Sequence, residues 1–282
     1  MTPTPPAVPD GTAAGASGPS PRLPSLPREA VSRTVGRLQA GYRQDAPWAV
    51  AAVARLRREA GRDAYASPTA WGLDHLETLN ELREARRTAE PEGRDGGIAA
   101  PSYFSSAARA TQEERERRED TAVHIAVTLW ALHQQSLRDE PMHLVGWPLG
   151  RAVRRLAHGR TGVRDSEASV DGAGADPAEE RVEDAGETVR RRFVRVGTAS
   201  DTDVFATRLR ELVLLLRSAR IPLDYALLAD QLLLWQDENR RDDVRRAWGR
   251  DFHRRHGRPD PAHVDGEGDE AATDSVPADD LA

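Results

Sequence analysis

The chain has 282 residues, of which 38% are hydrophobic and 30% are charged, with a net charge of -6 and no cysteine. The absence of cysteine excludes disulfides, zinc–thiolate sites and thiol nucleophiles, and no run of about 18 apolar residues is present that would cross a membrane as a helix. The N-terminal segment lacks the charged region and apolar stretch of a secretory signal, so we expect a cytoplasmic protein with no membrane partner.

Three segments have compositions that cannot bury a core. Residues 1–27 are rich in Pro, Gly, Ala and Ser, residues 164–186 add acidic residues to a similar composition, and residues 259–282 carry eight acidic residues and no arginine. We therefore expect 1–27 to be a disordered tail, 164–186 a flexible acidic linker and 259–282 a disordered acidic tail.

Between these segments, apolar residues recur at helical spacing. Pro47 is suited to the first position of a helix, which carries Trp48, and Asp201 is a good N-cap. In chain order, helices are expected over 28–42, from Pro47 to Gly61, from Ser67 to the glycine-rich patch at 93–97, over 121–137, from Pro148 to Gly159, over 187–196, from Asp201 to Ser218, from Pro222 and Asp224 to about Asn239, and over roughly 241–255.

Strand signals are nearly absent, because the chain has neither Asn-Gly turns nor sustained alternation of β-branched residues. The expected fold is all-α. Its simplest architecture is two small helical bundles, residues 28–163 and 187–258, joined by the flexible acidic linker and flanked by disordered tails.

No group of residues has the spacing of an active site. None of the eight histidines forms an HExxH pair, and P-loop, GxSxG and dinucleotide-binding glycine patterns are missing. Asp74, Glu77 and Glu81 share a helix face and offer a cation site, although an exposed polar face is the simpler interpretation. We expect a non-enzymatic protein with no metal and no other cofactor.

The distribution of charge favours a nucleic-acid partner. All 40 basic residues are arginine; residues 28–163 carry 21 arginines against 18 acidic residues, and residues 188–258 carry 16 against 10. The segments that can fold are therefore basic, whereas residues 164–187 carry 2 arginines against 9 acidic residues. Each arginine presents a planar guanidinium that can bind phosphate through two donors.

Three clusters hold most of the predicted nucleic-acid-binding arginines, and one further arginine ends the helix from Asp201. They are Arg151, Arg154 and Arg155; Arg190, Arg191, Arg192 and Arg195; Arg245, Arg246 and Arg250; and the separate Arg217. Such contacts recognise charge and backbone shape rather than base sequence. The tryptophans and Phe193 offer stacking platforms for bases, but their apolar stripes favour core positions.

Five segments of the chain form a specific pattern: LRREAGRDAYASPTAW (56–71), VTLWALHQQS to HLVGWPLGRAVRRL (127–156), RRRF (190–193), LRELVLLLRSARIPLDYALLADQLLLW (209–235) and VRRAWGRDF (244–252). They resemble the CasB family, the small subunit of the type I-E CRISPR Cascade complex. The resemblance covers nearly all of residues 30–256 in the family's order. The long N-terminal tail and the acidic insert depart from the family pattern.

The resemblance implies a helical, two-lobed, non-catalytic subunit of an antiviral complex. Its implied partners are other Cascade subunits, a second copy of itself, the crRNA, and the target and non-target DNA strands. The implied role is to stabilise the R-loop and the displaced strand. The matching arginines are Arg151, Arg154, Arg155, Arg190 to Arg192, Arg217, Arg245, Arg246 and Arg250.

Two other functions remain open on the residues alone. One is a helix–turn–helix transcription factor with its turn at Ile221-Pro222, although the following helix is apolar apart from Gln231 and Gln236. The other is a helical scaffold with no nucleic-acid role.

Overall fold

Helices make up the regular structure of this chain. The computed structural model describes residues 24–66, 74–89, 106–163 and 177–254, with side chains from residue 185 onward in the last range. Across these four ranges there is no β-strand, only an isolated parallel bridge between His143 and Leu223. The all-α prediction is confirmed.

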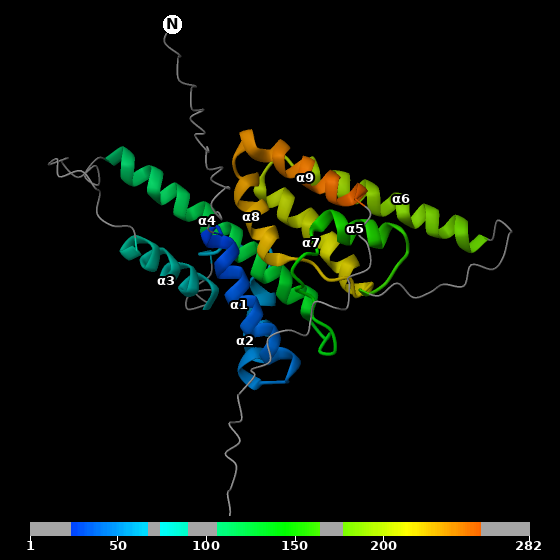
Figure 1. The fold of residues 1–282 in the computed structure, drawn as a ribbon, viewed down its shortest axis with the longest axis horizontal. Helices are drawn as coiled ribbons and strands as arrows, with labels where there is room; N and C mark the ends of the chain where they lie inside the picture. The colour runs from blue at the N-terminus through cyan, green and yellow to red at the C-terminus, as the bar shows by residue number, and fades with distance from the viewer. Residues whose placement is uncertain (1–23, 67–73, 90–105, 164–176, 255–282) are drawn as a thin grey trace, which may run out of the picture.

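The helices follow one another with short connections in the second half of the chain (Figure 1). They are α1 (Leu26–Arg43), α2 (Pro47–Glu59), α3 (Asp74–Ala89), α4 (Ser106–Gln134), α5 (Leu149–Ala157), α6 (Pro177–Gly197), α7 (Thr202–Ser218), α8 (Tyr225–Trp235), the 3-10 turn η3 (Glu238–Arg240) and α9 (Arg241–His253).

Most helix starts agree with the sequence prediction, because the capping residues act as expected. Pro47 occupies the first turn of α2, and the Asp201 carboxylate accepts the N–H of Val204 at 2.8 Å. The expected helix start at residues 67–69 lies outside the described residues. The corresponding helix, α3, is described from Asp74 onward.

Helices α4 and α8 differ in length from the prediction. Helix α4 begins at Ser106 rather than residue 121, since arginines and glutamates one turn apart support the charged stretch, as in the Arg118–Glu114 pair at 2.8 Å. Helix α8 ends at Trp235 rather than about Asn239, because the Asp237 carboxylate accepts the Asn239 N–H and starts η3.

The predicted division into two separate bundles is not confirmed. One continuous cluster of buried hydrophobic residues runs from α1 to α9. Helix α8, expected in the second bundle, packs against α1 and α4, and α5, expected in the first, packs against α6 and α9. Elements from both halves of the chain therefore share one core.

The ends of the expected tails and linker also differ from the prediction. Helix α6 begins at Pro177, so residues 177–186 of the expected linker are helical. Helix α1 begins at Leu26, within the expected N-terminal tail, and Ser25 caps its first turn. The expectations of disorder at 1–23, 164–176 and 259–282 fall outside the described residues.

The segment 221–225, IPLDY, joins the two halves of the core. The Leu223 N–H donates to the Met142 carbonyl at 3.0 Å, and Asp224 caps α8. The Tyr225 hydroxyl lies 2.8 Å from Nδ1 of His133, and both side chains are fully buried. The IPLDY segment, part of the sequence resemblance, therefore stabilises the fold. It holds α8 in the core, where α8 is not available to enter a DNA groove.

Within the part of the chain that the structure describes, no helix is long and apolar enough to span a membrane.

Candidate nucleic-acid interface

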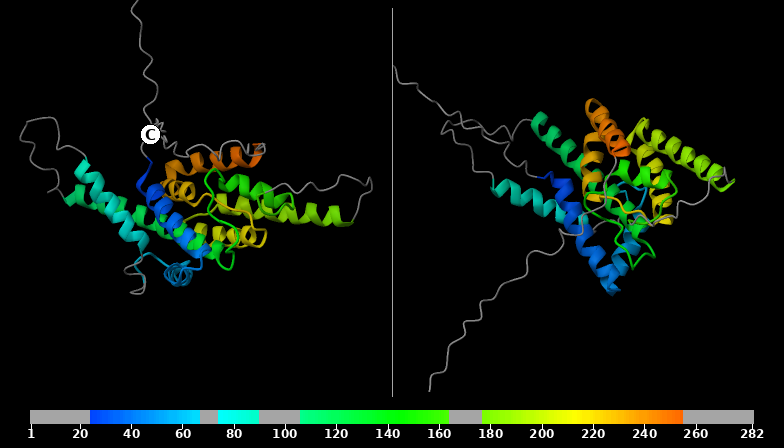
Figure 2. Two further views of the ribbon diagram at one scale, coloured as in Figure 1. Left: turned by 60° about the horizontal axis from the view of Figure 1, so that its bottom comes forward. Right: turned by 45° about the vertical axis from the view of Figure 1, so that its right-hand side comes forward.

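Helices α5 and α9 cross in unusually close contact. A Cβ atom at Gly150 would lie 2.3 Å from the Trp248 carbonyl oxygen and 2.7 Å from the Phe252 nitrogen, so only glycine fits there. Figure 2 shows α5, α6 and α9 side by side in both views. The first and third arginine clusters are thereby brought onto neighbouring helices.

Helix α6 completes this group of helices. The Phe193 ring stacks on Phe252 with centroids 5.7 Å apart, and lies 6.1 Å from Trp248. Near the other end of the contact, Nε of Arg245 donates to the Gly197 carbonyl at 2.7 Å. The two helices therefore run antiparallel, and all three arginine clusters converge in space.

We call the arginines of these three helices the arginine surface. Its members are Arg151, Arg154 and Arg155 of α5, Arg190, Arg191, Arg192 and Arg195 of α6, and Arg245, Arg246 and Arg250 of α9.

The α5 arginines stabilise the local fold. The guanidinium of Arg151 lies 4.0 Å from the centre of the Trp147 ring, and Nε of Arg155 donates to the Gly162 carbonyl at 2.5 Å. Nη1 of Arg154 donates to the last carbonyls of α9, those of residues 252 and 253, at 3.0 and 3.1 Å. Such donors satisfy carbonyls left over at a helix end.

The α6 arginines are mostly exposed. Arg190 and Arg191 share Glu187, at 3.9 and 3.3 Å, and Arg192 lies 3.9 Å from Glu211. Arg195 is exposed, and its guanidinium contacts no hydrogen-bonding or acidic partner among the residues described.

The α9 arginines form a similar series. Arg245 pairs with Asp242 at 2.7 Å, and Arg246 lies 3.6 Å from Asp243. The Arg250 side chain is exposed and has no ion pair in the described part of the chain. Exposed pairs of this kind contribute little to stability, roughly 0–1 kcal/mol, so a phosphate group can replace the acid at small cost.

Arg217 does not join the arginine surface. It lies at the end of α7, where Nε donates to the Gln135 carbonyl at 3.1 Å, just beyond the end of α4. Arg217 therefore connects the end of α7 to the end of α4, which is a structural reason for an arginine at this position.

The arginine surface keeps positive charge that local acids do not neutralise. Arg154 donates to carbonyls, which are dipoles without net charge, and it uses only one of its three nitrogens. Arg195 and Arg250 have all their donors available to solvent among the described residues. The arrangement is suited to phosphate groups, which accept paired donors from a guanidinium.

The aromatic residues separate into two groups. Trp130, Trp147, Trp235 and Trp248 are at most 4% exposed, which confirms the core prediction for them. Trp48 is 50% exposed, so the prediction that it belongs to the core is wrong. Its position one residue after Pro47 places it on the outer side of α2.

The prediction also missed exposed arginines outside the three clusters. Arg55, Arg58 and Arg62 lie on the outer side of α2 and the turn after it. The sequence signal was present in LRREAGR, because buried Val53 and Leu56 fix which side of the helix faces solvent.

The three carboxylates Asp74, Glu77 and Glu81 do not form a metal site. Asp74 pairs with Arg37 at 2.6 Å, and Glu77 and Glu81 are exposed. In the described ranges, no group of three or more histidine or acidic side chains is arranged to hold a metal ion.

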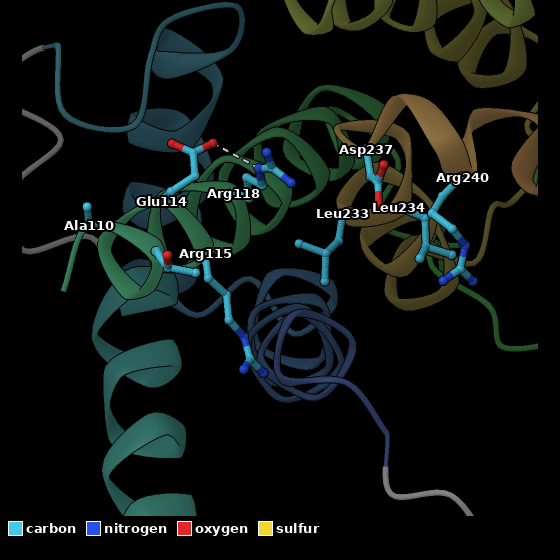
Figure 3. A pocket seen from close by; sticks show the side chains of 9 residues that line it. Ala110, Glu114, Arg115, Arg118, Leu233, Leu234, Asp237 and Arg240 are labelled. Atoms are coloured by element: carbon cyan, nitrogen blue, oxygen red, sulfur yellow. Dashed lines mark hydrogen bonds and ion pairs between the residues drawn. The ribbon is translucent and has the colours of Figure 1, made fainter. Parts of the chain in front are cut away.

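A groove of about 560 Å³ lies between α4 and the end of α8 (Figure 3). It is lined by Ala110, Thr111, Glu114, Arg115, Arg118, Leu233, Leu234, Asp237 and Arg240. Figure 3 shows Glu114 turned toward Arg118, so the Glu114 carboxylate is already paired. The Thr111 hydroxyl in the lining donates to the Ala107 carbonyl at 3.0 Å.

Comparison with known proteins gives a consistent result. Residues 52–253 match the family described as CRISPR-associated protein Cse2. A CasB crystal structure from Thermobifida fusca is similar, with 36% identity, a TM-score of 0.55, and coverage of 82% of this chain and 100% of that chain. CasB from M. ruber matches at 20% identity and a TM-score of 0.45, over 82% of this chain and 93% of that chain. No curated protein sequence matches.

Proposed function

Since the chain belongs to the CRISPR-associated Cse2 family, also called CasB, the small subunit of the type I-E Cascade complex, we propose that it holds nucleic acid by the sugar–phosphate backbone. The ligand would be the displaced non-target strand and the guide RNA–target DNA region of the R-loop. The protein would act without catalysis, metal or cofactor, in the cytoplasm, next to a second copy of itself.

The convergence of three arginine clusters on α5, α6 and α9 carries this proposal. They come from three separate segments, residues 151–155, 190–195 and 245–250, yet Phe193, Phe252 and Gly150 bring their helices into contact. A strand of arbitrary sequence must be held without base recognition, which arginine contacts to phosphate provide.

A sequence-specific transcription factor is disfavoured by the position of α8. Most of its residues are buried against α1 and α4, and Gln231 accepts the indole N–H of Trp248 at 2.8 Å. A recognition helix needs an exposed polar face to enter a major groove.

The test is fluorescence anisotropy of two unrelated labelled single-stranded DNAs over a salt series. The variant R195Q/R246Q/R250Q removes three exposed charges that support no backbone carbonyl in the described structure. We expect equal affinity for both sequences in the wild type, and in the variant a log–log salt slope smaller by about 2, from roughly 0.7 per lost phosphate contact.

The matched control is R33Q/R87Q/R117Q, which removes the same charge from exposed ion-paired arginines on α1, α3 and α4. It should leave the slope unchanged. An equal loss in both variants would mean that only net charge matters, and an unchanged slope in the first variant would reject the arginine surface as the binding site.

A further inference from the structure

A second cationic surface lies on α2, far from the arginine surface. In Figure 1, α2 lies at the bottom of the molecule and α9 at the top. Trp48, Arg55 and Arg58 are separated by seven and three residues, which places them on one side of a helix with 3.6 residues per turn. All three are exposed, and so is Arg62 in the turn that follows. We call these four residues the α2 stripe.

The charge of the α2 stripe is only weakly balanced. Arg55 and Arg58 form no ion pair with any residue that the structure describes. The Glu59 side chain is buried and lies 3.8 Å from Arg62.

Helix α7 adds a cation to the same end of α2. A Cβ atom at Gly61 would lie 3.6 Å from Nη1 of Arg210, an exposed residue with no ion pair among those described. The preference of cations for a helix C-terminus accounts for Arg58. It accounts neither for Arg55, a full turn earlier, nor for an arginine that reaches across from another helix.

The Trp48 indole is held in place and half open to solvent. Its Cζ2 atom would be 2.5 Å from a Cβ at Gly41 of α1, so the six-membered ring packs closely on that glycine. The guanidinium of Arg37 lies 5.9 Å from the ring centre. The side chain is nonetheless 50% exposed, whereas the other described tryptophans are at most 4% exposed. An indole fixed beside arginines is the arrangement that stacks on unpaired bases.

We propose that the α2 stripe is a second binding surface for single-stranded nucleic acid, with phosphates on Arg55, Arg58 and Arg62 and a base stacked on Trp48. It takes its ligand class from the proposed function but uses different residues. The chemistry also differs, because the aromatic rings beside the arginine surface, Trp248, Phe193 and Phe252, pack against the core and one another, whereas Trp48 is half exposed.

The test is the intrinsic tryptophan fluorescence of the full chain titrated with unlabelled oligothymidylate. Stacking on Trp48 should quench the wild-type signal, and the variant W48F should lose that quenching. Trp48→Leu, which removes the stacking ring, should weaken binding about fivefold or more.

The arginines are tested separately by anisotropy with R55Q/R58Q. We expect the salt slope to fall by about 1.4, which is roughly 0.7 for each of two phosphate contacts. R33Q/R117Q, with two exposed arginines on other helices, is the matched control and should not change it. Circular dichroism melting of every variant separates lost binding from lost folding.

The experiments test the two binding surfaces independently. Undiminished quenching in W48F, or unchanged affinity and slope in R55Q/R58Q, would overturn the α2 stripe, whatever R195Q/R246Q/R250Q does. A loss confined to the α2 variants would instead leave the stripe standing and reject the arginine surface.

Discussion

At the scale of single residues, the interior of the first half holds an unusual histidine pair. Nε2 of His75 lies 3.1 Å from Nδ1 of His124, and both side chains are buried between α3 and α4. One ring must donate and the other accept, so the contact requires at least one neutral imidazole. Burial and the neighbouring His124 lower the pKa of His75 to about 3.

His133 has the same property on the other side of the core. Its fully buried ring contacts the Tyr225 hydroxyl, and burial lowers its pKa to about 3. In the unfolded chain, His75 and His133 both titrate with a pKa near 6.5. The folded protein therefore binds fewer protons than the unfolded chain between about pH 6.5 and pH 3, and stability falls as the pH drops through that window.

We expect the free energy of unfolding to fall by roughly 2–3 kcal/mol between pH 7.5 and pH 5.5, about 1.4 kcal/mol for each of these two histidines. Urea denaturation at the two pH values measures it. His158→Gln, which changes an exposed histidine, should show the same fall. Equal stability at both pH values would contradict the burial of His75 and His133 in their neutral forms.

At the scale of elements, the crossing of α5 and α9 decides where the arginines go. Gly150 allows the two backbones to touch, and Nη1 of Arg154 binds the end of α9. The exposed guanidinium of Arg250 lies in the last turn of that same helix. The position of the arginine surface thus depends on one glycine and one brace.

We predict that Gly150→Ala lowers stability by about 1–3 kcal/mol, because a methyl group there overlaps backbone atoms that cannot rotate away. It should also weaken single-strand binding by moving α9. Gly249→Ala, next to Trp248 in α9, meets nothing within 4 Å and should be neutral or stabilising by up to about 1 kcal/mol. Thermal and urea unfolding compare the two, and equal effects would contradict the close crossing.

At the scale of the whole molecule, positive and negative charge are separated along the chain. Residues 188–258 have an excess of arginine, whereas residues 259–282 carry eight acidic residues and no arginine. Helix α9 ends at His253, beside Arg154 of the arginine surface. The acidic residues follow the end of α9 closely in the sequence, so we expect them to compete with phosphate for the arginines.

Deleting residues 259–282 should tighten binding of single-stranded DNA by roughly three- to tenfold at low salt, with the gain shrinking as salt screens the charges. A full-length variant with the eight acids changed to Asn or Gln should behave like the deletion. Anisotropy titrations check both. Wild-type affinity in both proteins would show that the acidic segment does not compete for the arginines.

The sequence by itself determined the all-α fold, the start of α2 at Pro47, the capped starts of α7 and α8, and the identity of the arginine clusters. These features depend on residues close together in the chain. A carboxylate caps the helix that follows it, as Asp201 and Asp224 do, and the period of apolar residues records which elements are helical. The family resemblance also lay in such local segments.

Only the tertiary structure decided how these parts meet. Local patterns could not show that α5 packs on α6 and α9 rather than in a separate first bundle, since contacts between distant segments leave no periodic signal. They could not show that Arg217 is a brace or that Trp48 is exposed, because an aromatic at helical spacing looks the same whether or not a neighbour covers it. Burial depends on the partner surface, and that surface exists only when the chain has folded.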